Sequence, residues 1–131
     1  MTETEGLKVF PSNFAPKATI ARFEKAAREA GMTVFAVIDF AADAKKVGVF
    51  LDESILIIFG NPAVGTRVLQ DVPQAGIDLP LKAFAWTQEG RHWLSCNEPS
   101  FLARRHGVHD MGTIVKMSEA LNKIVTSTLQ D

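Results

Sequence analysis

The sequence predicts a two-layer α+β domain in which helices pack on one face of a mainly antiparallel or mixed sheet. Short apolar segments, alternating or unbroken, predict strands, and longer segments with apolar residues every three or four positions predict helices. Two of the strands follow each other as a hairpin, which favours antiparallel pairing. The expected order of elements is β-α-β-α-β-α-β-β-α-α. The length of 131 residues is that of one domain, so a single domain over residues 1–131 is expected.

The first strand and helix are predicted at Leu7–Phe10 and Pro16–Ala30. Ser12-Asn13 and then Pro16 mark the start of the helix, since proline is tolerated in the first turn. Within the helix, apolar residues recur at the spacing of one buried face. Gly31 is suited to end it, because glycine enters the left-handed cap conformation without penalty.

Two further strands are predicted at Thr33–Ile38 and Ser54–Phe59. Asp39 is the expected N-cap of a short helix between them, which Gly48 closes. The run Ile55–Phe59 is apolar without a break, which predicts burial on both faces and a central place in the sheet.

A helix from Asn61-Pro62 to about Asp71 follows, and Val72–Asp78 is expected to be a loop. The hairpin pairs Leu81–Trp86 with His92–Cys96. In its second strand, alternation puts His92, Leu94 and Cys96 on one face and Trp93 and Ser95 on the other. Two more helices are expected, one from Asn97-Glu98-Pro99 to near Gly107 and one from about Thr113 to Leu129.

Composition excludes several classes of function. The chain carries 14 basic and 15 acidic residues, a net charge of −1, so it lacks the basic field that nucleic-acid binding requires. No apolar run is long enough to cross a membrane. The N-terminus lacks the pattern of a secretory signal, and a single cysteine permits no internal disulfide. A cytoplasmic protein without nucleic-acid or membrane partners is therefore expected.

Several strings then resemble one known family. They are Val34–Asp39, the FGNP…GT string at Phe59–Thr66, the DLPLK string at Asp78–Lys82, Asn97-Glu98-Pro99 and Arg105-His106-Gly107. The chain resembles the family catalogued as domain of unknown function 302 from about Leu7 to Leu129. The resemblance implies a small α+β domain, often found alone in bacteria and archaea, with no settled activity.

The chain departs from that family pattern at two positions. Phe40 stands where similar members usually carry His, and Cys96 where they usually carry Tyr. If the family uses that His as a ligand or base, this chain has lost it, so no metal or haem cofactor is expected here.

A possible anion site follows the strand Ser54–Phe59. Gly60 and Gly65 are spaced as in a phosphate loop, but Thr66-Arg67 stands where the loop needs Lys and then Ser or Thr. A small anion held by the helix N-terminus remains possible, with Asn61, Thr66 and Arg67 as its ligands. The alternative is structural: the glycines permit tight turns and Asn61 caps the helix.

The histidines and the cysteine offer weaker chemistry. His106 and His109 lie three residues apart, but a metal needs three or four converging ligands, and the third His would come from the hairpin. His106 is also explained as a hydrogen-bonded residue at a helix C-terminus. Cys96 shares a face with Leu94, which favours a buried apolar role over a nucleophilic one.

Two functions from different classes fit these patterns. The first is a small-ligand-binding or interaction module without turnover, because no nucleophile–base pair, metal set or cofactor fingerprint is recognisable. The second is an enzyme that acts on a small anionic metabolite, with Asn61, Thr66 and Arg67 holding the anion and Asp39 or His106 as acid or base.

A homodimer is expected with either function. Mean hydropathy is +0.08, and the hairpin carries three large aromatic groups: Phe84, Trp86 and Trp93. One side of the hairpin must be covered by the C-terminal helix or by a second subunit. Two-fold dimers are the commonest solution, so an interface at a sheet edge or at the aromatic hairpin is expected.

Overall fold

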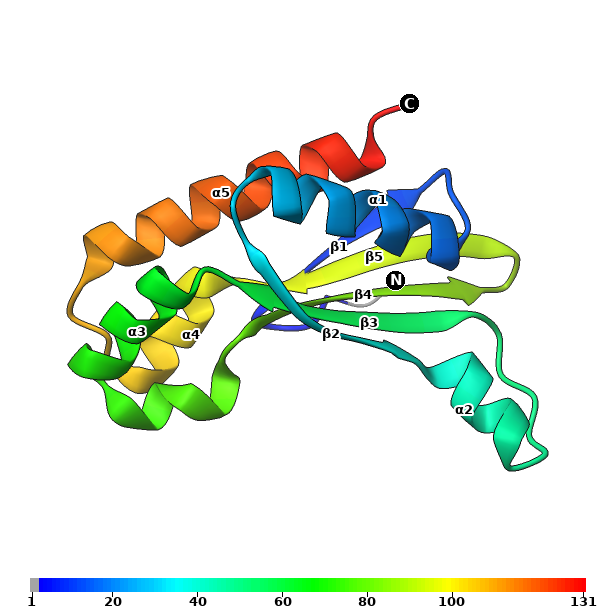
Figure 1. Cartoon of the computed structure of the whole chain (residues 1–131), viewed down its shortest axis with the longest axis horizontal. Helices are drawn as coiled ribbons and strands as arrows, with labels where there is room; N and C mark the ends of the chain where they lie inside the picture. Colours follow the sequence, from blue (N-terminus) through cyan, green and yellow to red (C-terminus); the bar gives the residue numbers. More distant parts are fainter. Residues whose placement is uncertain (1–2) are drawn as a thin grey trace.

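The computed structural model describes residues 3–131 and has the predicted α+β architecture (Figure 1). Its strands are β1 (Leu7–Ser12), β2 (Thr33–Asp39), β3 (Ser54–Gly60), β4 (Leu81–Gln88) and β5 (Arg91–Asn97). Its helices are α1 (Pro16–Glu29), α2 (Phe40–Lys46), α3 (Pro62–Asp71), α4 (Pro99–His106) and α5 (Met111–Leu129), with a 3-10 helix η1 (Pro73–Asp78). The fold class and the order of the predicted elements are confirmed.

The five strands form one sheet in the order β1-β5-β4-β3-β2, and every neighbouring pair is antiparallel. Helices α1 and α5 lie side by side across one face of this sheet, while α3, η1 and α4 gather at one end of it (Figure 1). Helix α2 projects from the opposite end. The molecule therefore has a helix-covered face and an open face.

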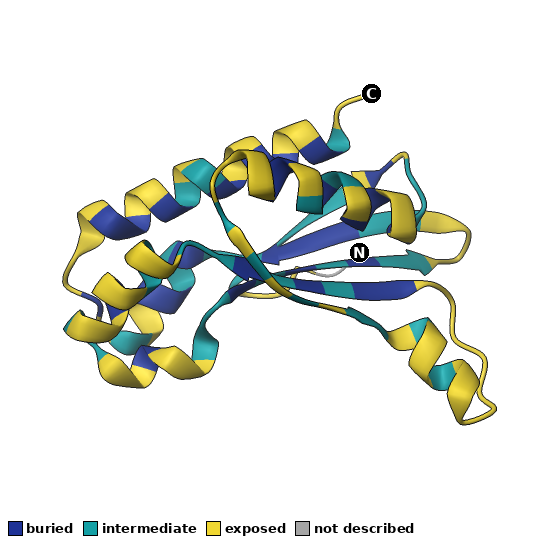
Figure 2. Cartoon of the chain, in the orientation of Figure 1, coloured by how far each residue is buried: buried dark blue, intermediate teal, exposed yellow. Residues whose placement is uncertain are grey.

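The core lies between the sheet and the two long helices (Figure 2). Phe23 of α1 and Phe59 of β3 are fully buried, and their rings meet edge to face with centroids 4.9 Å apart. Leu94 and Cys96 of β5 also face this core, as the alternation in the hairpin predicts. Burying each large side chain contributes about 1.5–3 kcal/mol, so this layer holds the two long helices on the sheet.

The predicted place of β3 is wrong in part. β4 is the central strand, and β3 lies between it and the edge strand β2. Ile57 and Phe59 are fully buried, but Leu56 and Ile58 on the other face are only half-buried. Burial on both faces does not occur in the described chain because no helix covers the open face.

Two local predictions also differ from the structure. Val72–Asp78 is not an open loop, since η1 occupies Pro73–Asp78. Ser12-Asn13 does not cap α1, whose N-cap residue is Ala15 without a side-chain cap. Ser12 ends β1 instead, and its hydroxyl lies 2.8 Å from the hydroxyl of buried Thr19.

Candidate functional site

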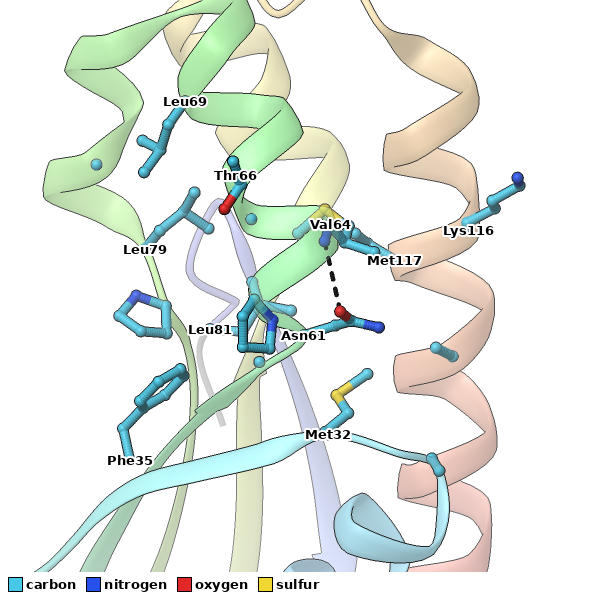
Figure 3. A pocket seen from close by; sticks show the side chains of 17 residues that line it. Met32, Phe35, Asn61, Val64, Thr66, Leu69, Leu79, Leu81, Lys116 and Met117 are labelled. Carbon is cyan, nitrogen blue, oxygen red and sulfur yellow. Dashed lines mark hydrogen bonds between the residues drawn. The ribbon is translucent and has the colours of Figure 1, made fainter.

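A cavity lies where β3 ends and α3 begins (Figure 3). Its volume is about 440 Å³, within the range of about 300–1,000 Å³ that small-molecule sites usually have. The elements around it are the segment before β2 and the start of β2, α3, η1 with the segment after it, and the middle of α5. We call this cavity the α3 pocket.

Apolar side chains form most of the wall of the α3 pocket. They come from four separate parts of the chain: Met32 and Phe35, Val64 and Leu69, Leu79 to Leu81, and Met117. Figure 3 shows Met32, Phe35 and Leu79 around the lower and left sides of the cavity, with α5 on the right. The wall of the pocket therefore offers mainly apolar contacts.

Three polar side chains lie at the pocket, and two of them are uncharged. Asn61 Oδ1 accepts hydrogen bonds from the backbone N–H groups of Ala63 at 3.0 Å and Val64 at 3.4 Å. The Asn61 amide NH₂ has no partner among the described residues, so it can donate to a ligand. Thr66 contributes a hydroxyl, whereas the Lys116 side chain points away from the cavity (Figure 3).

Two glycines keep part of the pocket open. A Cβ on Gly60 would meet Pro80 and Phe35 at ordinary contact distances of 3.6 and 3.8 Å. A Cβ on Gly65 would meet nothing within 4 Å. Neither glycine has a positive φ. A side chain added at Gly65 would therefore extend into free space without straining the backbone.

The structure brings together only two of the five residues predicted to hold a ligand. Asn61 and Thr66 line the α3 pocket, but Arg67 does not. Hydrogen bonds from Thr113 chiefly lower the pKa of Asp110 at the N-terminus of α5, and the charge of Arg67 adds a smaller effect in the same direction. The positive charge of Arg67, which was predicted to hold an anion, therefore lies near Asp110 and not at the wall of the pocket.

Asp39 lies at the far end of the sheet from Asn61. It pairs with Ile55, whereas Thr33 pairs with Gly60 at the other end of β3. At about 3.4 Å per residue, this separation is on the order of 17 Å, too far for one small ligand. Asp39 caps α2 by accepting a hydrogen bond from the N–H of Ala42 at 2.9 Å, as predicted.

His106 ends α4 and is bonded to Asp78, which ends η1. Its Nε2 lies 2.5 Å from Asp78 Oδ2, and Arg105 donates to both carboxylate oxygens of Asp78 at 2.9 and 3.0 Å. The hydrogen bond from His106 is the main cause of the lowered pKa of Asp78, and burial opposes it. Asp78 and Arg105 also line a smaller cavity of about 210 Å³. The cluster ties η1 to α4.

The three histidines do not converge. His92 pairs with Thr87 at 3.0 Å, and His109 pairs with Asp71 at 2.8 Å. Within residues 3–131, no group of three or more His, Cys, Asp or Glu side chains is placed to hold a metal ion. Burial raises the pKa of the Cys96 thiol to about 11, which fits its predicted apolar role.

Phe40 and Cys96, the two departures from the family pattern, lie on opposite faces of the sheet. The Phe40 ring meets Phe84 on the open face, with centroids 6.0 Å apart. Cys96 is 2% exposed and faces the helix-covered core. Side chains at these two positions would not share one ligand.

Sequence reasoning missed the apolar wall of the pocket, above all Met32, Leu79 and Met117. One signal was present, because the FGNP…GT and DLPLK strings both contribute residues to this wall. Nothing local in either string shows that the two meet, since the contact depends on how α3 and η1 pack.

Comparison with known proteins decides the family. The family model described as "Domain of unknown function DUF302" matches residues 9–127. The chain belongs to the DUF302 family. The predicted resemblance is thereby confirmed. The crystal structure of an uncharacterized conserved DUF302 protein from Bacillus stearothermophilus has the same fold, with a TM-score of 0.84 at 16% identity over 95% of this chain and 99% of that one.

Curated relatives of this DUF302 chain are longer proteins. It is 42% identical over 104 residues to proteins named Fluoride-specific ion channel FluC 1 from Brucella suis biovar 1 and from Brucella abortus biovar 1. The match covers 79% of this chain but only 41% and 38% of those relatives. In the described part of this chain, no helix has the length and apolar character of a membrane span.

Proposed function

We propose that this DUF302 chain is a small-ligand-binding module without turnover, and that its ligand lies in the α3 pocket. The observation that carries the proposal is the pocket itself: a mainly apolar cavity of about 440 Å³ with Asn61 and Thr66 at its wall. Apolar walls supply affinity, and a few placed polar groups supply orientation. The ligand class that fits is a mainly apolar small molecule with one hydrogen-bond acceptor, which the Asn61 amide would bind.

The absence of turnover is proposed from the polar groups around the pocket. Acid–base catalysis needs a titratable group within hydrogen-bond reach of the substrate. Lys116 is the one titratable residue of the pocket wall, and its side chain points outward (Figure 3). The nearby pair Asp78 and His106 is joined to itself and to Arg105. None of these three titratable side chains is placed to exchange a proton with a molecule in the pocket, which supports binding without turnover.

The alternative, an enzyme acting on a small anionic metabolite, has less support. It needs free N–H groups at the start of α3, and Asn61 Oδ1 already accepts from Ala63 and Val64. It also needs Arg67 at the pocket, which Arg67 does not line.

The names of the curated relatives raise fluoride as a possible ligand. Fluoride is a small and strongly hydrated anion, so a site for it must replace water with several donors or cations. A wall made mostly of Met, Leu and Phe side chains does not do this. We therefore do not propose fluoride as the ligand of the α3 pocket.

Native mass spectrometry of the freshly purified chain tests the proposal. A co-purified small molecule is expected, and Gly65→Leu should remove it because the added side chain enters the open pocket. Gly112→Leu is the matched control, since Gly112 lies at the start of α5 outside the pocket. Fluoride should leave the melting temperature unchanged.

Two results would count against this function. One is reproducible turnover in a broad screen of small anionic substrates that Gly65→Leu abolishes. The other is a bound molecule that Gly65→Leu retains as well as Gly112→Leu does, which would place it outside the α3 pocket.

A further inference from the structure

The open face of the sheet carries a continuous row of aromatic rings. Phe40 meets Phe84 edge to face, Phe84 stacks on Trp86 at 5.5 Å, and Trp86 stacks on Trp93 at 6.5 Å. The strand pairing puts Leu56 opposite Phe84 and Trp86 opposite Trp93 on this same face. Phe84, Trp86 and Trp93 are half-buried rather than buried, because α1 and α5 lie on the other face.

An apolar arm projects beyond this face. It comprises α2 and the segment that follows it, residues 40–52, and α2 buries none of its residues (Figures 1 and 2). Five of the eleven large hydrophobic residues that are exposed in the described chain lie in this arm. They are Phe40, Val47, Val49, Phe50 and Leu51. Phe50 is the most exposed of them, at 85%.

The exposed area of the arm reaches the lower limit for a stable dimer. The exposed fractions leave on the order of 500 Å² of these five side chains in contact with water, taking roughly 150–200 Å² for a fully exposed side chain of this size. Burying them in two copies would cover about 1,000 Å², which is the area that a specific interface needs at least, and the half-buried rings of the open face add to it.

The charge pattern favours a second copy over a charged partner. The strand register places two charged residues on the open face of β3, β4 and β5, Lys82 and Arg91. The arm carries two acidic residues, Asp43 and Asp52, and two basic residues, Lys45 and Lys46. An aromatic surface with so few charges, which are of both signs, fits a second copy better than a nucleic acid or a charged peptide.

We propose that the open face and the arm together form the interface of a two-fold homodimer. In a two-fold interface each copy contributes the same surface, so the aromatic rows meet at the centre and each arm covers the partner's open face. Aromatic groups are enriched at the centre of such interfaces, as this arrangement requires. The interface is independent of the α3 pocket, which lies at the other end of the sheet from α2.

Sedimentation of the full chain across the micromolar range tests the proposal. A species of twice the 14.3 kDa monomer mass is expected. Phe50→Asp should raise the dimer dissociation constant on the order of tenfold or more, because it buries an unpaired charge. Ile77→Asp is the matched control, since Ile77 is 78% exposed but lies on η1, away from this surface. It should dimerise like the unchanged chain.

Intrinsic fluorescence gives a second readout that a folding defect would not imitate. Both tryptophans of the chain lie on the open face. Dilution of the unchanged chain should shift their emission to longer wavelength while far-UV circular dichroism stays constant. A single species near 14.3 kDa throughout would overturn the proposal and leave the face to another partner. Equal dissociation constants for Phe50→Asp and Ile77→Asp would overturn the assigned surface.

Discussion

Asp78 links η1 to α4, because its carboxylate accepts hydrogen bonds from His106 and Arg105. Its pKa lies below the usual value in the folded chain. As pH falls, Asp78 therefore takes up a proton in the unfolded chain at a higher pH than in the folded chain. The stability that Asp78 contributes is fully present above its pKa in the unfolded chain and is lost as pH falls through its pKa in the folded chain. We predict that Asp78→Asn lowers the free energy of unfolding at neutral pH by on the order of 1 kcal/mol.

Denaturant unfolding at a series of acidic pH values measures this effect. Asp78→Asn should reduce the dependence of stability on pH in the acid range but not remove it. Part of the dependence of stability on pH should remain, because two other carboxyl groups also have lowered pKa values. Hydrogen bonds lower the pKa of Asp71 chiefly from His109 and the pKa of Asp110 chiefly from Thr113. If the stability of the Asp78→Asn variant depends on acidic pH in the same way as that of the unchanged chain, the ionisation of Asp78 is not coupled to folding.

At the scale of elements, α2 and α3 have similar caps but different surroundings. Asn61 caps α3, which packs on η1 and α5, while Asp39 caps α2, which buries no residue. Asn61→Ala should lower the global free energy of unfolding by about 0.5–2 kcal/mol. Asp39→Ala should instead speed hydrogen exchange in α2 while changing global stability less, because α2 can open without exposing the core. Equal global losses in the two variants would contradict this.

At the scale of the whole molecule, dimerisation should couple to stability. A dimer that must dissociate on unfolding has a melting temperature that rises with protein concentration. We predict this rise for the unchanged chain and for Ile77→Asp, and a smaller rise for Phe50→Asp. Differential scanning calorimetry over a range of concentrations measures it. A melting temperature independent of concentration in all three proteins would contradict the dimer.

Much of the fold could be predicted from local patterns. Helical spacing marked α1 and α5, alternation marked the two faces of β5, and Asp39 and Asn61 were correctly identified as caps. These features depend on residues within a few positions of each other, so the sequence displays them directly. The candidate site was predicted less well: Asn61 and Thr66 line the pocket, but Asp39, Arg67 and His106 do not.

The sequence by itself determined the strands and α-helices, the α+β class and the face of β5 on which Trp93 lies. Only the tertiary structure decided that β3 has one half-buried face, that α2 stands clear of the core, and that Met32, Leu79 and Met117 meet in one cavity. The physical reason is distance along the chain. Periodicity records which face of an element is apolar, but the burial of that face depends on which distant segment packs against it.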